Sequence, residues 1–230
     1  MIELDHITKA YWYRGIPKYI AKDVSAVIPN GAKLALMGRN GAGKSTLLAM
    51  IAGGINPNRG RIRSTGSLSW PIGLTGTIQG DLTGIQNVKF IARVYGVDSD
   101  ELVDFVGDFA DLGINYREPV RTYSSGMRGR LNFGMSMGIH FDTYLIDEVT
   151  ATGDVAFKGK SKKLFEDRLA NAGLVFVSHS ESLAKSMCTS GAVLENGTIT
   201  FFDDVAEAIK LHNQNMKLDS IVGKGAPPPD

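Results

Sequence analysis

A glycine-rich loop between an apolar run and a helix-like segment constrains the fold of this chain more than any other feature. The apolar run covers residues 34–37 and the helix-like segment covers residues 46–51, and the loop fits the pattern G-x-x-x-x-G-K-[ST] at every specified position. A strand that turns through glycines into a helix leaves several backbone N–H groups directed at one spot, beside the positive end of the helix dipole. This order of elements predicts an α/β fold with a site for nucleotide phosphates. The residues of this phosphate loop and helix start are Gly38, Arg39, Asn40, Gly41, Ala42, Gly43, Lys44, Ser45 and Thr46.

Two side chains of the phosphate loop add specific chemistry. The ammonium group of Lys44 can reach the β- and γ-phosphates of a nucleotide, and the hydroxyl of Ser45 can ligate Mg²⁺. The alternative is a glycine-rich turn that precedes Lys-Ser by chance, and the flanking strand and helix argue against it. We therefore expect a nucleotide bound together with Mg²⁺.

The overall composition excludes several classes of protein. Lys and Arg total 25 and Asp and Glu total 24, so a net charge of +1 offers no broad footprint for nucleic acid. No stretch approaches 18 consecutive apolar residues, so we expect no membrane span and any membrane contact through a partner. Residues 1–5 carry acids early and are more typical of a strand than of a secretory signal. The single cysteine, Cys188, excludes an intramolecular disulfide and is expected to be a small buried residue in a reducing cytosol.

The first third of the chain has the alternating pattern of an antiparallel β flap. Residues 2–11 alternate like an edge strand, and residues 19–28 follow as a second strand. A turn at residues 29–31 leads into the strand at 33–37, and β character returns at residues 62–70. An antiparallel flap is therefore expected before the phosphate loop.

The middle of the chain, at about residues 80–140, is predicted to be a helical insertion. Thr83 can cap a helix with an apolar stripe, and a second helix follows with apolar residues at three-to-four spacing. The stripe of the first helix contains Val88, Ile91, Val94 and Tyr95, and that of the second contains Leu102, Phe105, Val106, Phe109 and Leu112.

The last third returns to strands. Residues 144–146 and 174–177 read as strands, and residues 192–201 read as a hairpin on an Asn-Gly turn. A last helix is expected at residues 204–217, before a tail at 223–230 that is expected to be disordered. The expected stripe of that helix is Val205, Ala208, Ile209, His212 and Met216.

Two carboxylates and a histidine follow predicted strands. Asp147 and Glu148 come directly after residues 144–146, and neighbouring side chains on a strand point to opposite faces. Asp147 can therefore reach a metal ion while Glu148 is aimed at an attacking water, the two roles that phosphoryl transfer requires. His179 follows residues 174–177 and lies where ligands bind in parallel α/β sheets, so it is a candidate contact for the γ-phosphate. His6, His140 and His212 are interpreted as surface or packing residues.

A second helix start offers a second anion site. Ser124 or Ser125 can cap a helix that runs through Leu131, so the N-terminus of that helix can also hold a phosphate. One nucleotide does not need two such sites in one chain. The pair makes sense in a symmetric head-to-tail homodimer, where each copy contributes its second site to the nucleotide of the other.

Taken together, these motifs resemble the ATP-binding subunit of ATP-binding cassette (ABC) transporters, over residues 1–205. Residues 124–127 match the family signature, with Ser125 in place of the usual glycine and Met127 in place of the usual glutamine. The resemblance implies a P-loop NTPase cassette that binds ATP with Mg²⁺ in a homodimer. It also implies roles for single residues: Ser124 and Gly126 as contacts to the partner's γ-phosphate, Asp154 at the dimer interface, His179 as the switch histidine and Glu148 as the catalytic base.

The resemblance further implies an aromatic residue that stacks on adenine and a glutamine that contacts metal and water. Tyr11 is at the matching place in the β flap, with Tyr13 or Tyr19 as alternatives because the chain carries extra residues before Lys33. For the glutamine, the choice is Gln79, which is closer to Asn87 than in most relatives.

Within the family, the chain is most similar to exporters of capsular polysaccharide from Gram-negative bacteria. Residues 82–84, 90–96, 123–131 and 147–154 carry this similarity, and too few residues follow the last hairpin for an added carbohydrate-binding domain. The implied assembly is a peripheral homodimer on the cytoplasmic face of the bacterial inner membrane, docked on separate permease subunits that handle the polysaccharide. The helical insertion and residues 71–84 would couple the nucleotide state to the permease. Exporters of O-antigen or teichoic acid, and soluble ABC ATPases, are the alternatives.

The domain organisation expected from this resemblance is simple. Residues 1–207 form the ABC nucleotide-binding domain, including the helical insertion. Residues 208–230 form the end of the last helix and the disordered tail.

Overall fold

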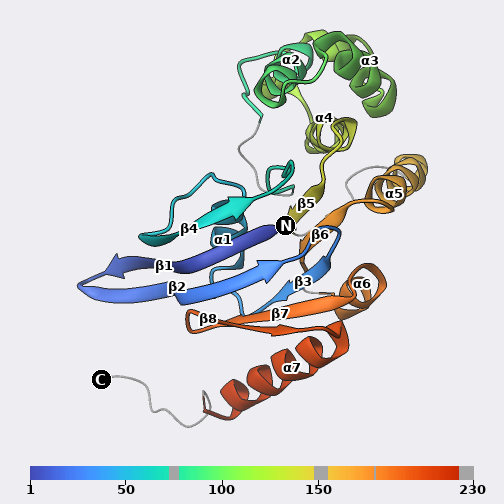
Figure 1. Cartoon of the computed structure of the whole chain (residues 1–230). Helices are drawn as coiled ribbons and strands as arrows, with labels where there is room; N and C mark the ends of the chain where they lie inside the picture. Colours follow the sequence, from blue (N-terminus) through green and yellow to red (C-terminus); the bar gives the residue numbers. More distant parts are fainter. Residues whose placement is uncertain (73–77, 148–154, 179, 223–230) are drawn as a thin grey trace, which may run out of the picture. The chain divides into compact units, whose positions relative to one another are not determined.

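The computed structural model describes residues 1–72, 78–147, 155–178 and 180–222 (Figure 1). The chain divides into two compact units. The first contains residues 1–71, 142–148 and 173–230, and the second contains residues 72–141 and 149–172. Within the described residues, no helix is both long and apolar enough to cross a membrane.

An antiparallel sheet of three strands opens the first unit. Its order is β2-β1-β4, so β1 lies in the centre. Ile2 pairs with both Ile28 and Ser64, and the prediction of an edge strand here was wrong. Alternating apolar residues show that one face of a strand is covered, but they do not report how many strands pair with its edges. The strands are β1 (Ile2–Tyr13), β2 (Ile16–Ile28) and β4 (Arg59–Ser64).

The last of these strands is shorter and begins earlier than the sequence suggested. β character was expected over residues 62–70, whereas β4 ends at Ser64. Beyond it, Leu68 forms only an isolated bridge to Thr143.

A second sheet of five strands carries the core of the first unit. Its order is β5-β6-β3-β7-β8, with β8 antiparallel to β7 and the other pairs parallel. The central strands read as continuous apolar runs because parallel strands are covered on both faces. Asn196 (φ 50°) and Gly197 (φ 80°) form the turn between β7 and β8, which confirms the predicted Asn-Gly hairpin. The strands are β3 (Lys33–Met37), β5 (Thr143–Asp147), β6 (Gly173–Val177), β7 (Ser190–Glu195) and β8 (Thr198–Phe202).

In its described residues, the first unit also contains the helices α1 (Lys44–Ile51), α6 (Glu181–Met187) and α7 (Val205–Val222). Gly191 of β7 is in such close contact with Ala208 of α7 that a Cβ on the glycine would overlap it. Within the predicted stripe of α7, Val205, Ala208 and Ile209 are buried, whereas Met216 is 46% exposed.

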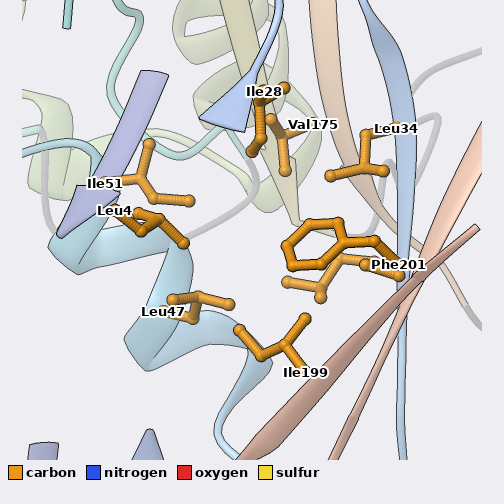
Figure 2. A pocket seen from close by; sticks show the side chains of 10 residues that line it. Leu4, Ile28, Leu34, Leu47, Ile51, Val175, Ile199 and Phe201 are labelled. Atoms are coloured by element: carbon orange, nitrogen blue, oxygen red, sulfur yellow. The ribbon is translucent and has the colours of Figure 1, made fainter. Parts of the chain in front are cut away.

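The core of the first unit is tightly packed and apolar (Figure 2). Side chains from both sheets and from α1, among them Leu4, Leu36 and Leu47, line a space of about 10 Å³. This volume is near the minimum for a single water molecule, and the lining is apolar, so the space is a packing defect rather than a ligand site.

The second unit is helical. Thr83 accepts a hydrogen bond from the backbone N–H of Gln86, while the Gln86 side chain accepts one from the backbone N–H of Thr83, a complete capping box. The predicted cap is therefore confirmed. The elements are α2 (Gly84–Tyr95), α3 (Ser99–Ala110), the 3₁₀ helices η1 (Gly113–Arg117) and η2 (Val120–Thr122), α4 (Ser125–Gly138) and α5 (Val155–Leu169).

One member of the predicted α2 stripe points to solvent. Val88 and Ile91 are 0% and 4% exposed, but Val94 is 60% exposed. Six residues of an α-helix turn the chain by about 600°, which leaves Val94 roughly 120° away from Val88. Ala92, only about 40° from Val88, takes its place in the buried face and is 0% exposed.

Candidate nucleotide-binding site

The phosphate loop connects the end of β3 to the start of α1. Gly38 (φ 150°), Gly41 (φ 76°) and Gly43 (φ 107°) adopt backbone angles that residues with a side chain rarely adopt. This series of glycine conformations turns the chain sharply from the buried strand into the helix. The predicted strand, loop and helix therefore occur in the expected order.

Two of these glycines are also required by close packing. A Cβ on Gly43 would lie 2.6 Å from Cγ2 of Ile20 in β2, and a Cβ on Gly38 would overlap the carbonyl oxygen of Leu194 in β7. The loop is thus held between a strand of each sheet. A side chain at either position would move the backbone N–H groups on which phosphate binding depends.

Lys44 directs its charge back to the loop. Its side chain is buried, and Nζ donates hydrogen bonds to the carbonyl oxygens of Gly38 at 2.7 Å and Arg39 at 3.0 Å. A buried ammonium beside backbone dipoles is a strong attraction for an anion, because little water screens it. An incoming phosphate can exchange with these carbonyl groups as the partner of Lys44.

The start of α1 fits a phosphate as well. Its N-cap is Gly43, which has no side chain to cap the helix, and the first turn contains no acidic residue. The first backbone N–H groups of a helix have no partner within the helix, and this helix provides them with neither a capping side chain nor a carboxylate of its own first turn. The loop therefore combines a positive helix end, a buried ammonium and close backbone approach, which together fit a polyphosphate.

The carboxyl ends of three parallel strands meet beside the loop. Asp147 of β5 pairs with Val177 of β6, which pairs with Leu36 of β3. The half-buried Asp147 thus ends its strand at the edge from which the phosphate loop leaves, two strands away, or about 10 Å. Ser45 provides the first helical hydroxyl on the loop side, and it is exposed. A hydroxyl and a carboxylate oxygen are ligands that suit Mg²⁺.

Three predicted site residues fall in segments that the structure does not describe. Glu148 and Asp154 lie within residues 148–154, and His179 is a single such position after β6. Val177, the last residue of β6, belongs to the same carboxyl edge as Asp147. The proposed roles of Glu148, Asp154 and His179 therefore remain predictions from the sequence.

The β1–β2 hairpin contributes side chains near the loop. Tyr11, the predicted adenine contact, is 46% exposed and pairs across the hairpin with Lys18. The ammonium of Lys18 reaches to 3.6 Å from the position that a Cβ on Gly41 would occupy. Sequence reasoning missed both Lys18 and Ile20, because only the pairing register of the hairpin brings them to the loop. The alternatives Tyr13 and Tyr19 are 70% and 36% exposed.

The remaining predicted residues belong to the second unit. The backbone N–H of Gln79 donates to Oδ1 of Asn87 at 2.8 Å, and the Gln79 carbonyl accepts from Nδ2 of Asn87 at 3.0 Å. Asn87 is only 1% exposed, so it fixes the backbone of Gln79 while the Gln79 side chain stays exposed. Because Asn87 is only eight residues from Gln79, its side chain can hold both backbone groups of Gln79. The sequence did not predict this role for Asn87.

Ser124, rather than Ser125, is the N-cap of α4. Its hydroxyl oxygen accepts a hydrogen bond from the backbone N–H of Met127 at 3.2 Å. Gly126 lies in the first turn, where, among the described residues, a Cβ would come within 4 Å of the Ser124 hydroxyl alone, at 3.9 Å. Gly126 therefore adds no side chain beside the Ser124 hydroxyl at the start of α4.

The fold and the phosphate loop define a P-loop nucleotide-binding protein with an antiparallel flap. Comparison with known proteins makes the class specific: residues 21–151 match the ABC transporter family. The chain is 44% identical over 222 residues to the polysialic acid transport ATP-binding protein KpsT of Escherichia coli, covering 95% of this chain and 99% of that protein. It is also 44% identical over 214 residues to the capsule polysaccharide export ATP-binding protein CtrD of Neisseria meningitidis serogroup B, covering 93% of this chain and 99% of the relative.

A solved structure described as an ATP-binding subunit of an ABC transporter has the same fold. It superposes with a TM-score of 0.74 at 23% identity, over 92% of this chain and 94% of that one. The chain belongs to the ABC transporter family, as the sequence motifs predicted.

Proposed function

We propose that this chain is the ATP-hydrolysing subunit that powers export of capsular polysaccharide across the bacterial inner membrane through a separate permease. The observation that carries the proposal is the match of nearly the whole chain to two proteins named for polysialic acid transport and capsule polysaccharide export. The geometry of the phosphate loop supports the ATPase part, because its glycines, helix start and Lys44 fit a polyphosphate.

Each described residue of the loop has a task in this reaction. The backbone N–H groups at the start of α1 hold the β- and γ-phosphates, and Lys44 leaves the carbonyls of Gly38 and Arg39 to bind the same oxygens. Ser45 and Asp147 are the proposed ligands of Mg²⁺, with Gln79 as a third group. Mg²⁺, when bound with the nucleotide, supplies charge neutralisation on the phosphate oxygens.

Hydrolysis requires a water aimed at the γ-phosphate. Glu148 is the proposed base, and His179 the proposed contact to the γ-phosphate. Tyr11 is the proposed stacking partner of adenine; its exposed ring lies beside the ammonium of Lys9, and Lys18 is its partner in the pairing of the hairpin. A carboxylate that accepts the proton of water as the bond forms lowers the barrier without binding ATP itself.

The complete site is proposed to form between two copies of the chain. The start of α4, with Ser124 as its cap and Gly126 in its first turn, would contact the γ-phosphate held by the partner copy, and Asp154 would lie at the interface. ATP then acts as a ligand that favours the closed dimer, and hydrolysis removes that preference. The dimer would dock peripherally on permease subunits at the cytoplasmic face, and the permease would handle the polysaccharide.

Replacing Glu148 by Gln tests the enzymatic part of the proposal. The variant is expected to bind ATP and form a long-lived dimer, with turnover reduced by roughly 100-fold or more, because the amide cannot accept a proton from water. Turnover would be measured by phosphate release and the dimer by size-exclusion chromatography with ATP. Rapid hydrolysis by this variant would refute the assignment of Glu148.

Deletion of the gene in its native cell tests the cargo. Capsular polysaccharide is expected to accumulate inside the cell and to disappear from the surface, with recovery when the wild-type gene is restored. Normal surface capsule would refute capsule export. Loss of O-antigen or teichoic acid instead would move the assignment to those polymers.

A further inference from the structure

The tip of the β1–β2 hairpin, residues 12–18, exposes large apolar side chains. Trp12, Tyr13 and Ile16 are 71%, 70% and 71% exposed, although side chains of these types usually lose most of their exposure in folded domains. Pairing between β1 and β4 ends at Thr8, whereas pairing between β1 and β2 continues to Tyr13. The outer part of the hairpin is therefore a two-stranded extension of its sheet (Figure 1).

Basic residues are concentrated in the hairpin, and some of them lie close to its tyrosine rings. Residues 9–22 contain four basic residues and no acidic one, whereas the whole chain has a net charge of only +1. The Arg14 guanidinium lies 5.4 Å from the ring centroid of Tyr13, and the Lys9 ammonium lies 5.2 Å from that of Tyr11. The hairpin thus combines concentrated positive charge with amphipathic rings.

The predicted adenine contact does not account for this composition. Tyr11 and Lys18 pair across the hairpin and so share one face, on the side of the phosphate loop. Trp12 pairs with Pro17, and adjacent side chains of a strand point to opposite faces, so Trp12 lies on the other face. One base cannot stack on both faces, which leaves Trp12 without a task in nucleotide binding.

Ile16 pairs with Tyr13 and so lies on the face opposite Trp12, which means that both can meet a surface only if the tip approaches it end on. We propose that the hairpin tip binds an anionic lipid surface end on, with Trp12 from one face and Ile16 from the other in the headgroup region and Arg14 against the lipid phosphates. Trp and Tyr are enriched at the interface between lipid and water, and each Lys or Arg near an anionic membrane adds attraction. A lipid surface is favoured because its negative charge is spread over the whole surface, as the basic residues are spread over residues 9–22 with no acidic residue among them. This contact goes beyond the proposed function, because the chain itself would touch the lipid, in addition to docking on permease subunits.

The fluorescence of Trp12 can be used to measure this contact. The chain has two tryptophans, and Trp70 is only 8% exposed. In a Trp70→Phe variant of the full chain, the emission of Trp12 would be recorded with vesicles of phosphatidylcholine alone and of phosphatidylcholine mixed equally with phosphatidylglycerol. A blue shift with the anionic vesicles only, which weakens as salt is added, is the expected result. Sedimentation of the unmodified chain with the same vesicles gives a second measure that does not depend on Trp70.

Matched variants separate the tip from the rest of the surface. Trp12→Ala combined with Ile16→Ala is expected to abolish sedimentation, whereas Ile114→Ala, at a position 80% exposed in the second unit, should leave it unchanged. Arg14→Gln should weaken binding about fivefold, and Lys185→Gln, which removes an exposed cation from α6, should not. ATP affinity of the Trp12 and Ile16 double variant should equal that of the unmodified chain.

Three outcomes would overturn the proposal. The first is a Trp12 emission that stays unchanged with anionic vesicles, and the second is equal binding to both vesicle types. The third is a Trp12 shift caused by ATP without vesicles, which would assign the tip to the nucleotide. None of these outcomes affects the assignment of the ATPase, whose test is turnover in solution.

Discussion

At the level of single residues, Gly43 and Lys44 carry the strongest physical argument for a phosphate site. Gly43 ends the loop with φ 107° against Ile20, and Lys44 begins the helix with its ammonium bound to loop carbonyls. Both features depend on atoms less than 4 Å apart. Single substitutions at these positions should therefore strongly weaken nucleotide binding. They should leave the second unit unaffected.

Gly43→Ala tests the close packing of the loop. The added Cβ would lie 2.6 Å from Cγ2 of Ile20 in a left-handed conformation, so the variant should lose ATP affinity and about 2–4 kcal/mol of stability. Gly53→Ala is the matched control, because Gly53 also has positive φ (78°) but nothing lies within 4 Å of its Cβ position. The control should cost only about 1–2 kcal/mol and leave ATP affinity unchanged, as measured by chemical denaturation and calorimetry. Equal losses in the two variants would contradict the packing argument.

Lys44→Ala tests the charge. Removing a buried ammonium that binds phosphate oxygens should weaken ATP binding by about 1.5–3 kcal/mol, or roughly 10- to 150-fold. Lys185→Ala, at an exposed position on α6, should bind ATP as the unmodified chain does. Titration calorimetry would measure the ATP affinity of both variants. An unchanged ATP affinity in Lys44→Ala would count against the phosphate-loop interpretation.

At the level of elements, caps and clamps position the helical unit. The capping box of Thr83 and Gln86 begins α2, and Asn87 one residue later holds the backbone of Gln79. The start of α2 therefore fixes the segment that carries the predicted metal- and water-contacting glutamine. A change that destabilises the start of α2 is therefore expected to loosen the backbone of Gln79 as well.

Thr83→Ala tests this link. Loss of the cap should destabilise the protein by about 1 kcal/mol, and Thr83→Ser should restore most of it because a serine hydroxyl caps the helix equally well. Hydrogen exchange at the backbone N–H groups of Gln79 and Gln86 should become faster in Thr83→Ala only. Unchanged exchange at Gln79 would show that Asn87 holds the segment without help from the cap.

At the level of the whole molecule, Cys188 reports on global stability. Its side chain is 4% exposed, and burial raises the pKa of the thiol from 9.0 to about 12. The thiol is therefore neutral and protected in the folded chain at physiological pH. We expect iodoacetamide to react with it only as fast as the protein opens.

The same burial predicts a pH dependence. The unfolded chain releases the thiol proton near pH 9 and the folded chain only near pH 12, so the free energy of unfolding should fall as pH rises between these values. Denaturant unfolding at pH 8 and pH 10 would measure the fall, and Cys188→Ala should remove the part due to the thiol. An identical fall in both proteins would show that other groups are responsible.

Local features of this protein could be read from the amino-acid sequence. The phosphate loop, the cap at Thr83 and the Asn-Gly turn could be predicted because each depends on neighbours in the chain. The cap of α4 was narrowed to Ser124 or Ser125, and the family followed from several such local motifs in their order along the chain. Only the folded structure shows which residues meet across long separations: β1 lies in the centre of its sheet, Ile20 and Lys18 lie against the loop, and Tyr11 pairs with Lys18 across the hairpin. Strand order and pairing register depend on hydrogen bonds between distant segments, which local periodicity does not encode.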